Sequence, residues 1–372
     1  MPAPLPESSA RAPSSSRPDL RLVVGREPEI APRKFGRLEG IDEARVLATW
    51  GVVWVHVVEM QGHSAGTAAL GRFGTSFYVA ALTVLAARGA LSHPGRTPSG
   101  EFLRATKRLL RPLLLWSLIY GAYYGYYAYL QRNSFEELVR WWGPFAGTAR
   151  HLWFLPFAAA MGPTVVGLVQ HLRGWSERRL AWATAVSGVG GYLLCYGVLF
   201  FVIPREFIVD SHLFRLDRWI EEIPLVLLVL GLTLWRAKKP PLRPSIARAL
   251  ALLGAFAVVE FGYLRGARWI VDTFHHVDSR YVSHAAGLAL LGAFLVMPRS
   301  GLTRLLARLR KETYFVFLSH LLALECLAGW LWNQPGFGTV PFAIATTFGI
   351  FAVSAALGSV VRRVPGLRAL AG

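Results

Sequence analysis

Arginine, histidine and glutamate are spaced along one apolar segment in a way that could support chemistry. In GIDEARVLATWGVVWVHVVEM, residues 40–60, Arg45 and His56 are 11 residues apart. At 100° per residue this spacing puts both side chains on one helix face, separated by roughly 16 Å along the axis. Glu59 follows His56 by three residues on a neighbouring stripe. Ionisable groups inside a membrane helix are costly, so we expect them to face a cavity or a partner.

This pattern could bind a phosphate-rich cofactor and supply a general base on the same helix face. Arg45, near one membrane surface, could hold a phosphate-rich cofactor. His56, deeper on the same face, could act as a general base because histidine changes protonation near neutral pH. Glu59 could orient the imidazole. The residues alone leave an alternative open, in which Arg45 extends to lipid headgroups and His56 bonds a neighbouring helix.

Three further segments combine basic and aromatic residues. They are RLLRP at 108–112, HLWFL at 151–155 and YFVFLSH at 314–320. Each of these segments has a simple structural explanation. The arginines could be ordinary basic loop residues, Trp153 an interfacial residue, His151 a solvated helix cap, and His320 a structural hydrogen-bond donor.

Known cofactor and metal motifs are missing from the sequence. His56, Glu59 and His63 share a helix face, but three ligands from one helix rarely close a coordination sphere. The two cysteines, Cys195 and Cys326, have no zinc-type spacing. We therefore expect no metal. Signatures of ATP-driven transport, dinucleotide binding and serine-elbow hydrolysis are also absent.

Composition and apolar runs predict the fold that must position these residues. Of 372 residues, 53% are hydrophobic and 17% are charged, whereas soluble domains carry about 25% charged residues. A helix needs about 20 apolar residues to cross a bilayer. We therefore predict an all-α polytopic membrane protein of about ten transmembrane helices. The predicted spans are 41–60, 73–91, 109–130, 151–170, 180–203, 219–236, 246–264, 281–298, 314–332 and 340–361.

The net charge of +18 follows this topology. With both termini in the cytoplasm, the inside segments hold 29 of the 40 Lys and Arg residues and the outside segments hold 10. This is the positive-inside bias of membrane proteins. The charge then reports orientation and attraction to anionic membrane lipid, and we expect no nucleic-acid partner. We expect a disordered cytoplasmic tail at 1–36, a membrane domain at 37–363 and a short cytoplasmic tail at 364–372.

Taken in order, the four motifs resemble those of the acyltransferase-3 family of integral-membrane O-acyltransferases. The first segment resembles the family's ID-x-x-R-x10-H helix, and RLLRP its RxxR motif. HLWFL resembles its aromatic segment, and YFVFLSH its late Y-x-x-(Y/F)-L-x-H helix. The resemblance covers roughly residues 37–361. It departs in the second helix, where Ala81 and Leu82 stand at the place of a common Ser-Gly pair. The chain is most similar to stand-alone members without an SGNH domain.

The resemblance implies transfer of an acyl group from acetyl-CoA, or another acyl-CoA, to a hydroxyl of a carbohydrate or related small acceptor. It implies a bacterial cytoplasmic (inner) membrane location. His56 matches the family's catalytic histidine and Arg45 its essential arginine. Arg108 and Arg111 match the RxxR pair, which with Arg45 would hold the CoA phosphates. His151 and Trp153, in the aromatic segment, and His320, in the late helix, are by the same resemblance candidates for substrate binding.

A secondary transporter or flippase for a sugar or lipid-linked substrate is the alternative prediction. Ten spans with ionisable residues also suit such a protein. A transporter would favour paired internal repeats and discontinuous helices, of which the sequence shows no sign. The four ordered motifs favour the acyltransferase.

Overall fold

Ten α-helices and one 3-10 turn make up the described part of the chain, in which no strand occurs. The computed structural model describes residues 39–62, 71, 73–131, 149, 151–197, 216–240, 242–273, 280–298, 301, 306 and 308–370. The helices are α1 (Glu39–Met60), α3 (Phe73–Ser92), α4 (Pro98–Gln131), α6 (Phe154–Leu172), α7 (Glu177–Gly197), α9 (Leu216–Ala237), α10 (Ile246–Thr273), α11 (Arg280–Val296), α13 (Thr313–Trp332) and α14 (Val340–Arg363), followed by η2 (Pro365–Leu370). The predicted all-α polytopic architecture is confirmed. The predicted tail at 1–36 lies outside the described residues.

Each predicted span coincides with one helix, in the predicted order. The largest difference is in α4, which begins at Pro98 and not near residue 109. An apolar-length criterion detects only the part of a helix that is apolar, whereas helical hydrogen bonding continues through the polar first turns. Arg108 and Arg111 therefore lie within helix α4 and not in a loop.

Four described helices are long and apolar enough to cross a membrane. They are α3, α6, α13 and α14. The segment Ser283–Val296 of α11 is apolar but shorter. Ionisable residues interrupt the apolar run elsewhere, as Arg45 does in α1 and the buried Glu222 does in α9. These interruptions mark where a membrane helix needs a polar neighbour.

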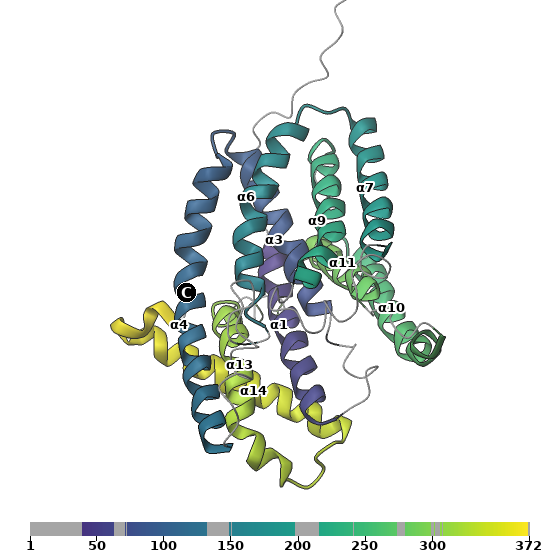
Figure 1. Ribbon diagram of the computed structural model, residues 1–372. Coiled ribbons are helices and arrows are strands. Elements are labelled where there is room, and N and C mark those ends of the chain that lie inside the picture. Colours follow the sequence, from purple (N-terminus) through teal and green to yellow (C-terminus); the bar gives the residue numbers. More distant parts are fainter. Residues whose placement is uncertain are drawn as a thin grey trace, which may run out of the picture.

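Helix α3 is the central packing element. It packs against α1, α6, α9 and α11, and Figure 1 shows it between α6 and α9. At Gly74 of α3, a Cβ atom would lie 2.3 Å from the carbonyl oxygen of Ala48 in α1. At Gly40 of α1, a Cβ atom would lie 2.1 Å from the carbonyl oxygen of Phe294 in α11. Small residues thus allow α1 to approach both neighbours closely.

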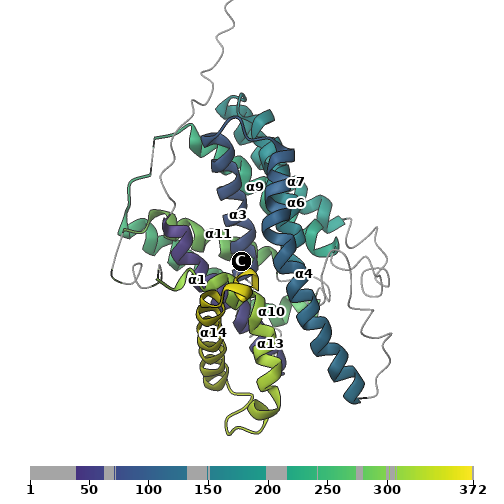
Figure 2. The same cartoon turned by 90° about the vertical axis from the view of Figure 1, so that its left-hand side faces the viewer.

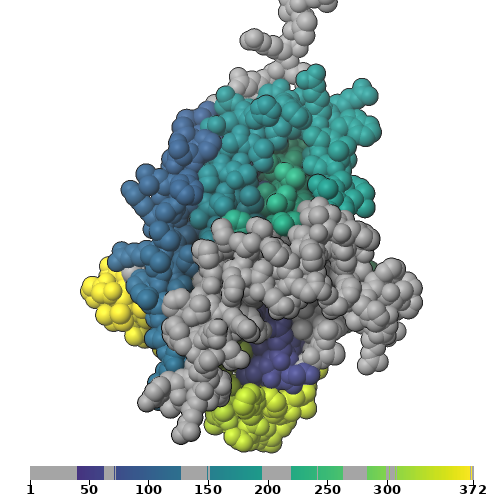
Figure 3. All heavy atoms as spheres, in the orientation of Figure 1, coloured from purple at the N-terminus to yellow at the C-terminus, as the bar shows by residue number. Residues whose placement is uncertain are grey.

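A second group of helices gathers around α13. This helix packs against α1 and α14, and η2 contacts both α14 and α4. Figure 2 shows α13 and α14 at the opposite end of the molecule from α6, α7 and α9. In the space-filling view, part of α1 reaches the surface beside the α13–α14 end (Figure 3). Helix α1 therefore belongs to both groups of helices. Its residues Arg45 and His56 lie where the two groups meet.

Candidate functional site

Three histidines from distant parts of the chain form a cluster. His56 comes from α1, His151 from the turn before α6, and His320 from α13. The ring centroids are 5.2 Å apart for His56 and His320, 5.0 Å for His151 and His320, and 6.4 Å for His56 and His151. The predicted base and two of the three predicted substrate-binding residues therefore lie in one place.

Burial differs among the three histidines. His151 is 4% exposed and His320 is 0% exposed, whereas the side chain of His56 is 16% exposed. His56 is thus the outermost member of the cluster. The alternative role of His151 as a solvated helix cap is wrong, because the residue is buried.

The hydrogen bonds of the two buried histidines determine their tautomers. Nδ1 of His320 donates to the carbonyl oxygens of Val316 (3.0 Å) and Phe317 (2.9 Å). Nε2 of His151 donates to the carbonyl oxygen of Leu318 at 3.2 Å. A carbonyl oxygen only accepts, so each of these nitrogens carries the proton of its neutral ring. The other two nitrogens, Nε2 of His320 and Nδ1 of His151, have no hydrogen-bond partner among the described residues.

Helix α4 holds the turn of α13 that carries His320. The hydroxyl of Tyr120 donates to the carbonyl oxygen of Leu318 at 2.9 Å and accepts from the backbone N–H of Leu322 at 3.1 Å. Its ring centroid lies 5.4 Å from that of His151. Tyr120 is fully buried. It therefore connects α4, α13 and the turn before α6 around the cluster.

Tyr120 was not among the predicted site residues, although the sequence carries a signal for it. Trp116, Tyr120 and Tyr124 recur at intervals of four, which places them on one face of α4. That face meets α13. Trp116 lies against Phe315, with ring centroids 5.6 Å apart, and the hydroxyl of Tyr124 donates to Oε1 of Glu325 at 2.8 Å. An aromatic stripe on α4 thus marked a helix–helix contact.

Glu59 stands next to His56, on the exposed side of the cluster. Its Oε2 is 3.6 Å from Nδ1 of His56, and its side chain is 43% exposed. This distance is too long for a hydrogen bond. It is short enough for an ion pair when His56 is protonated. Glu59 can therefore respond to a change in the charge of His56.

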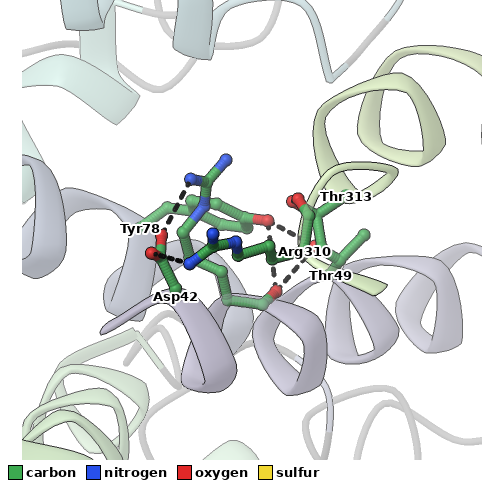
Figure 4. A network of polar contacts seen from close by, with 6 residues as sticks. Asp42, Thr49, Tyr78, Arg310 and Thr313 are labelled. Carbon is green, nitrogen blue, oxygen red and sulfur yellow. Dashed lines mark hydrogen bonds and ion pairs between the residues drawn. The ribbon is translucent and has the colours of Figure 1, made fainter. Parts of the chain in front are cut away.

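A second polar group surrounds Arg45 at the first turns of α1. Oδ1 of Asp42 lies 3.7 Å from Nη1 of Arg45, and Oδ2 of Asp42 accepts from Nη1 of Arg310 at 2.7 Å (Figure 4). All three side chains are partly exposed. One carboxylate thus holds two guanidinium groups near each other, with a net positive charge. Arg310 was not among the predicted residues, because basic residues in that loop were already explained by topology.

Neighbouring helices fix the backbone around Arg45. The hydroxyl of Thr49 donates to the carbonyl oxygen of Arg45 at 2.7 Å and is hydrogen-bonded to the hydroxyl of Tyr78. Tyr78, from α3, lies 3.3 Å from the same carbonyl oxygen. Thr313 Oγ1 donates to the carbonyl oxygen of Arg310 at 2.8 Å. Figure 4 shows these residues converging from α1, α3 and the start of α13.

The RxxR arginines occupy the exposed face of α4. Arg108 acts electrostatically on Tyr314, the residue after Thr313 in α13. Arg108 and Arg310 therefore both lie near the first turn of α13. Arg111 is exposed as well.

Trp153 lies apart from the histidines. It is buried in the core, and its ring packs against those of Phe154 (6.1 Å between centroids) and Phe157 (5.7 Å). Burial in the protein core excludes the alternative role as an interfacial residue. Among the described residues no ring contact joins Trp153 to the histidine cluster.

In the part of the chain that the structure describes, no group of three or more His, Cys, Asp or Glu side chains is arranged to hold a metal ion. His63, which by its spacing shares a helix face with His56 and Glu59, lies outside that part.

Comparisons with known proteins identify the family to which the chain belongs. No curated protein and no solved structure matches the chain. The family model described as an acyltransferase domain matches residues 38–359. That range includes both the histidine cluster and the arginines around Asp42. With a match over nearly its whole length, the chain belongs to the acyltransferase-3 family.

Proposed function

We propose that the protein transfers an acyl group, acetyl or another short chain, from acyl-CoA to a hydroxyl of a carbohydrate or related small acceptor. One observation carries this proposal. Helix α1 bears Arg45 within a group of cations and His56 within the histidine cluster, roughly 16 Å further along the axis. An extended pantetheine arm can bridge such a separation between the CoA phosphates and the thioester.

The arginines supply the proposed site for the CoA phosphates. Arg45 and Arg310 share Asp42, and Arg108 approaches the first turn of α13. Guanidinium groups bind phosphate through several parallel N–H donors. Arg111 adds charge on the same helix as Arg108. In this proposal these residues face the cytoplasm, where acyl-CoA is available, and the protein lies in a bacterial inner membrane.

His56 is the proposed general base. It removes the proton from the acceptor hydroxyl as the oxygen attacks the thioester carbonyl carbon. The carbon–sulfur bond of the resulting tetrahedral intermediate then breaks. The leaving thiolate takes the proton from His56, giving CoA and the ester product. Glu59 would stabilise the imidazolium, because its carboxylate lies 3.6 Å from Nδ1. As proposed, the step uses no metal.

Family membership supports a transferase and gives no support to the alternative of a transporter or flippase. Of the three predicted substrate-binding residues, His151 and His320 lie beside His56, so we keep them in the proposed site. Trp153 packs in the core, and we propose no contact between it and the acceptor.

The test is release of free CoA by purified protein in nanodiscs, with acetyl-CoA and a crude glycan extract. We expect acceptor-dependent release by the wild type, lowered roughly 10²- to 10⁴-fold in His56→Ala. His93→Ala is the matched control, because His93 is exposed and lies outside the site. If His56→Ala released CoA as fast as the wild type, His56 would not be the base. If acyl-CoA of any chain length neither reacted nor bound, the proposed function would be wrong.

A further inference from the structure

Two nitrogens inside the histidine cluster can accept hydrogen bonds, and the described part of the chain offers them no donor. They are Nε2 of His320 and Nδ1 of His151, because the opposite nitrogen of each neutral ring donates to carbonyls of α13. Both atoms are shielded from solvent, and neither has a partner among the described residues, His56 included. A buried acceptor without a donor is unfavourable. The two nitrogens therefore favour a ligand that carries N–H or O–H groups.

Helices α1 and α13 run in the same direction through the proposed site. At one end, Asp42 of α1 accepts from Arg310, just before α13 begins. At the other end, the rings of His56 and His320 lie 5.2 Å apart. His320 follows Arg310 by 10 residues, and His56 follows Arg45 by 11. A ligand with phosphates at the arginines and its reactive group at His56 therefore comes close to His320 as well.

Aromatic rings connect the arginine end of the site with the histidines. The hydroxyl of Tyr78 lies 3.3 Å from the carbonyl oxygen of Arg45, and its ring centroid is 5.8 Å from that of Phe317. The ring of Phe317 lies in turn 5.6 Å from that of His151. These contacts are mostly apolar, which suits a chain of methylene groups with few polar atoms. A ligand arm that enters here must displace these rings to reach the two nitrogens.

The pantetheine arm of an acyl-CoA carries donors at suitable places. It has two amide N–H groups on either side of a β-alanyl unit, about 5 Å apart when the arm is extended. The ring centroids of His151 and His320 are 5.0 Å apart. His320 is the nearer of the two to His56, at 5.2 Å against 6.4 Å for His151. The amide next to the thioester then falls at His320, and the more distant amide at His151.

We propose that the two buried histidines recognise the acyl donor: Nε2 of His320 accepts from the pantetheine amide nearest the thioester, and Nδ1 of His151 accepts from the second amide. This inference rests on the proposed acyl transfer and deepens it, because it assigns both residues to the acyl donor and not to the hydroxyl acceptor. The two bonds hold the thioester beside His56. The acceptor approaches from the side of Glu59, whose side chain is 43% exposed.

Conservative variants separate the acceptor nitrogen of each ring from the nitrogen that bonds to α13. The amide nitrogen of asparagine can take the place of Nδ1, and that of glutamine can take the place of Nε2. His320→Asn and His151→Gln therefore keep the bonds to the backbone carbonyls and lose the acceptors. His320→Gln and His151→Asn keep an acceptor toward the ligand and lose the bonds to α13.

The test is binding of CoA to the purified protein in detergent, measured by isothermal titration calorimetry without any acceptor. We expect His320→Asn and His151→Gln each to weaken binding about 3- to 10-fold, as is usual for the loss of one hydrogen bond. His320→Gln and His151→Asn should bind CoA more tightly than these two, although their melting temperatures are lower. The adenosine bisphosphate portion of CoA, which lacks the arm, is the control ligand, and its affinity should be the same in all variants.

The other results would count against the proposal. Unchanged CoA affinity in His320→Asn and His151→Gln would overturn it, and so would an equal loss for the control ligand or affinities that simply follow the melting temperatures. A raised KM for the glycan extract with unchanged CoA affinity would assign the nitrogens to hydroxyl groups of the acceptor instead. In all these cases the proposed acyl transfer would stand. If neither CoA nor acetyl-CoA bound to the wild type, the acyl-transfer proposal itself would fail, and this inference with it.

Discussion

Two regions of the molecule bury histidines in different ways. In the cluster of His56, His151 and His320, two buried ring nitrogens lack a hydrogen-bond partner among the described residues. In the region where α7, α9 and α11 meet, His284 is equally buried, but each of its nitrogens faces a polar side chain. Its Nδ1 lies 3.0 Å from the hydroxyl of Tyr192, and its Nε2 lies 3.2 Å from Oε2 of Glu222.

This difference shows that a buried histidine in a membrane helix does not by itself indicate chemistry. His284 is held between Tyr192 and Glu222, a carboxylate that is itself buried, and this arrangement joins three helices. The cluster around His56 is incomplete without a further donor. Within this cluster, His56 is partly exposed. Function is expected where buried ring nitrogens have no polar side chain beside them, and stability where a hydroxyl and a carboxylate hold the ring in place.

The largest expected effects on turnover come from removing one histidine from each region in turn. His56→Ala should lower the rate of CoA release by roughly 10²- to 10⁴-fold, because the proposed base is lost. His284→Ala should leave the rate per folded molecule within a few-fold of the wild type. Turnover is measured on the monodisperse fraction of each variant. Comparable losses in both would remove the distinction between the two regions.

Stability should show the reverse order. His284→Ala leaves the buried carboxylate of Glu222 without its imidazole, and we expect it to lower the free energy of unfolding by about 3 kcal/mol. Thermal unfolding in detergent measures this, with the exposed His171 changed to alanine as the control. An unchanged melting temperature would mean that the His284–Glu222 pair does not stabilise the fold.

The proposed donor site can be separated from the histidine cluster by a change in KM. Arg310→Ala should raise the KM for acetyl-CoA roughly tenfold, equivalent to about 1.4 kcal/mol, because a charged hydrogen bond to phosphate is lost. S-acetyl-pantetheine lacks the phosphates of the nucleotide, so its KM should not change. Arg104→Ala is the control, since Arg104 is exposed and pairs with Glu101. An equal effect on both donors would argue against phosphate binding by Arg310.

The smallest expected effect concerns the support of the cluster by α4. Tyr120→Phe keeps the aromatic ring but removes the hydrogen bonds to Leu318 and Leu322. We expect a loss of about 1 kcal/mol in stability and a reduction of a few-fold in kcat, since His320 lies on the same turn. Tyr126→Phe, at an exposed position of the same helix, is the comparison. If the two variants behaved alike, Tyr120 would not support the site.

The sequence by itself determined the elements and the placement of Arg45 and His56 on one helix. Ten apolar runs predicted ten helices in the right order, because the length of an apolar segment is a local property that the bilayer selects. Arg45 and His56 could be assigned to one face of α1 because helical periodicity is also local. The extent of α4 was underestimated, since its polar first turns carry no apolar signal.

Only the tertiary structure decided which side chains meet. His151 and His320 come from segments far apart in the sequence, and their tautomers depend on backbone carbonyls of α13 that no sequence pattern identifies. The link from Arg45 through Asp42 to Arg310 likewise requires α1 and the start of α13 to lie together. These contacts depend on how the helices are rotated and spaced. Rotation and spacing in turn depend on close packing, such as that of Gly74 against α1. Residue types along the chain limit which contacts are possible, but long-range packing selects the ones that form.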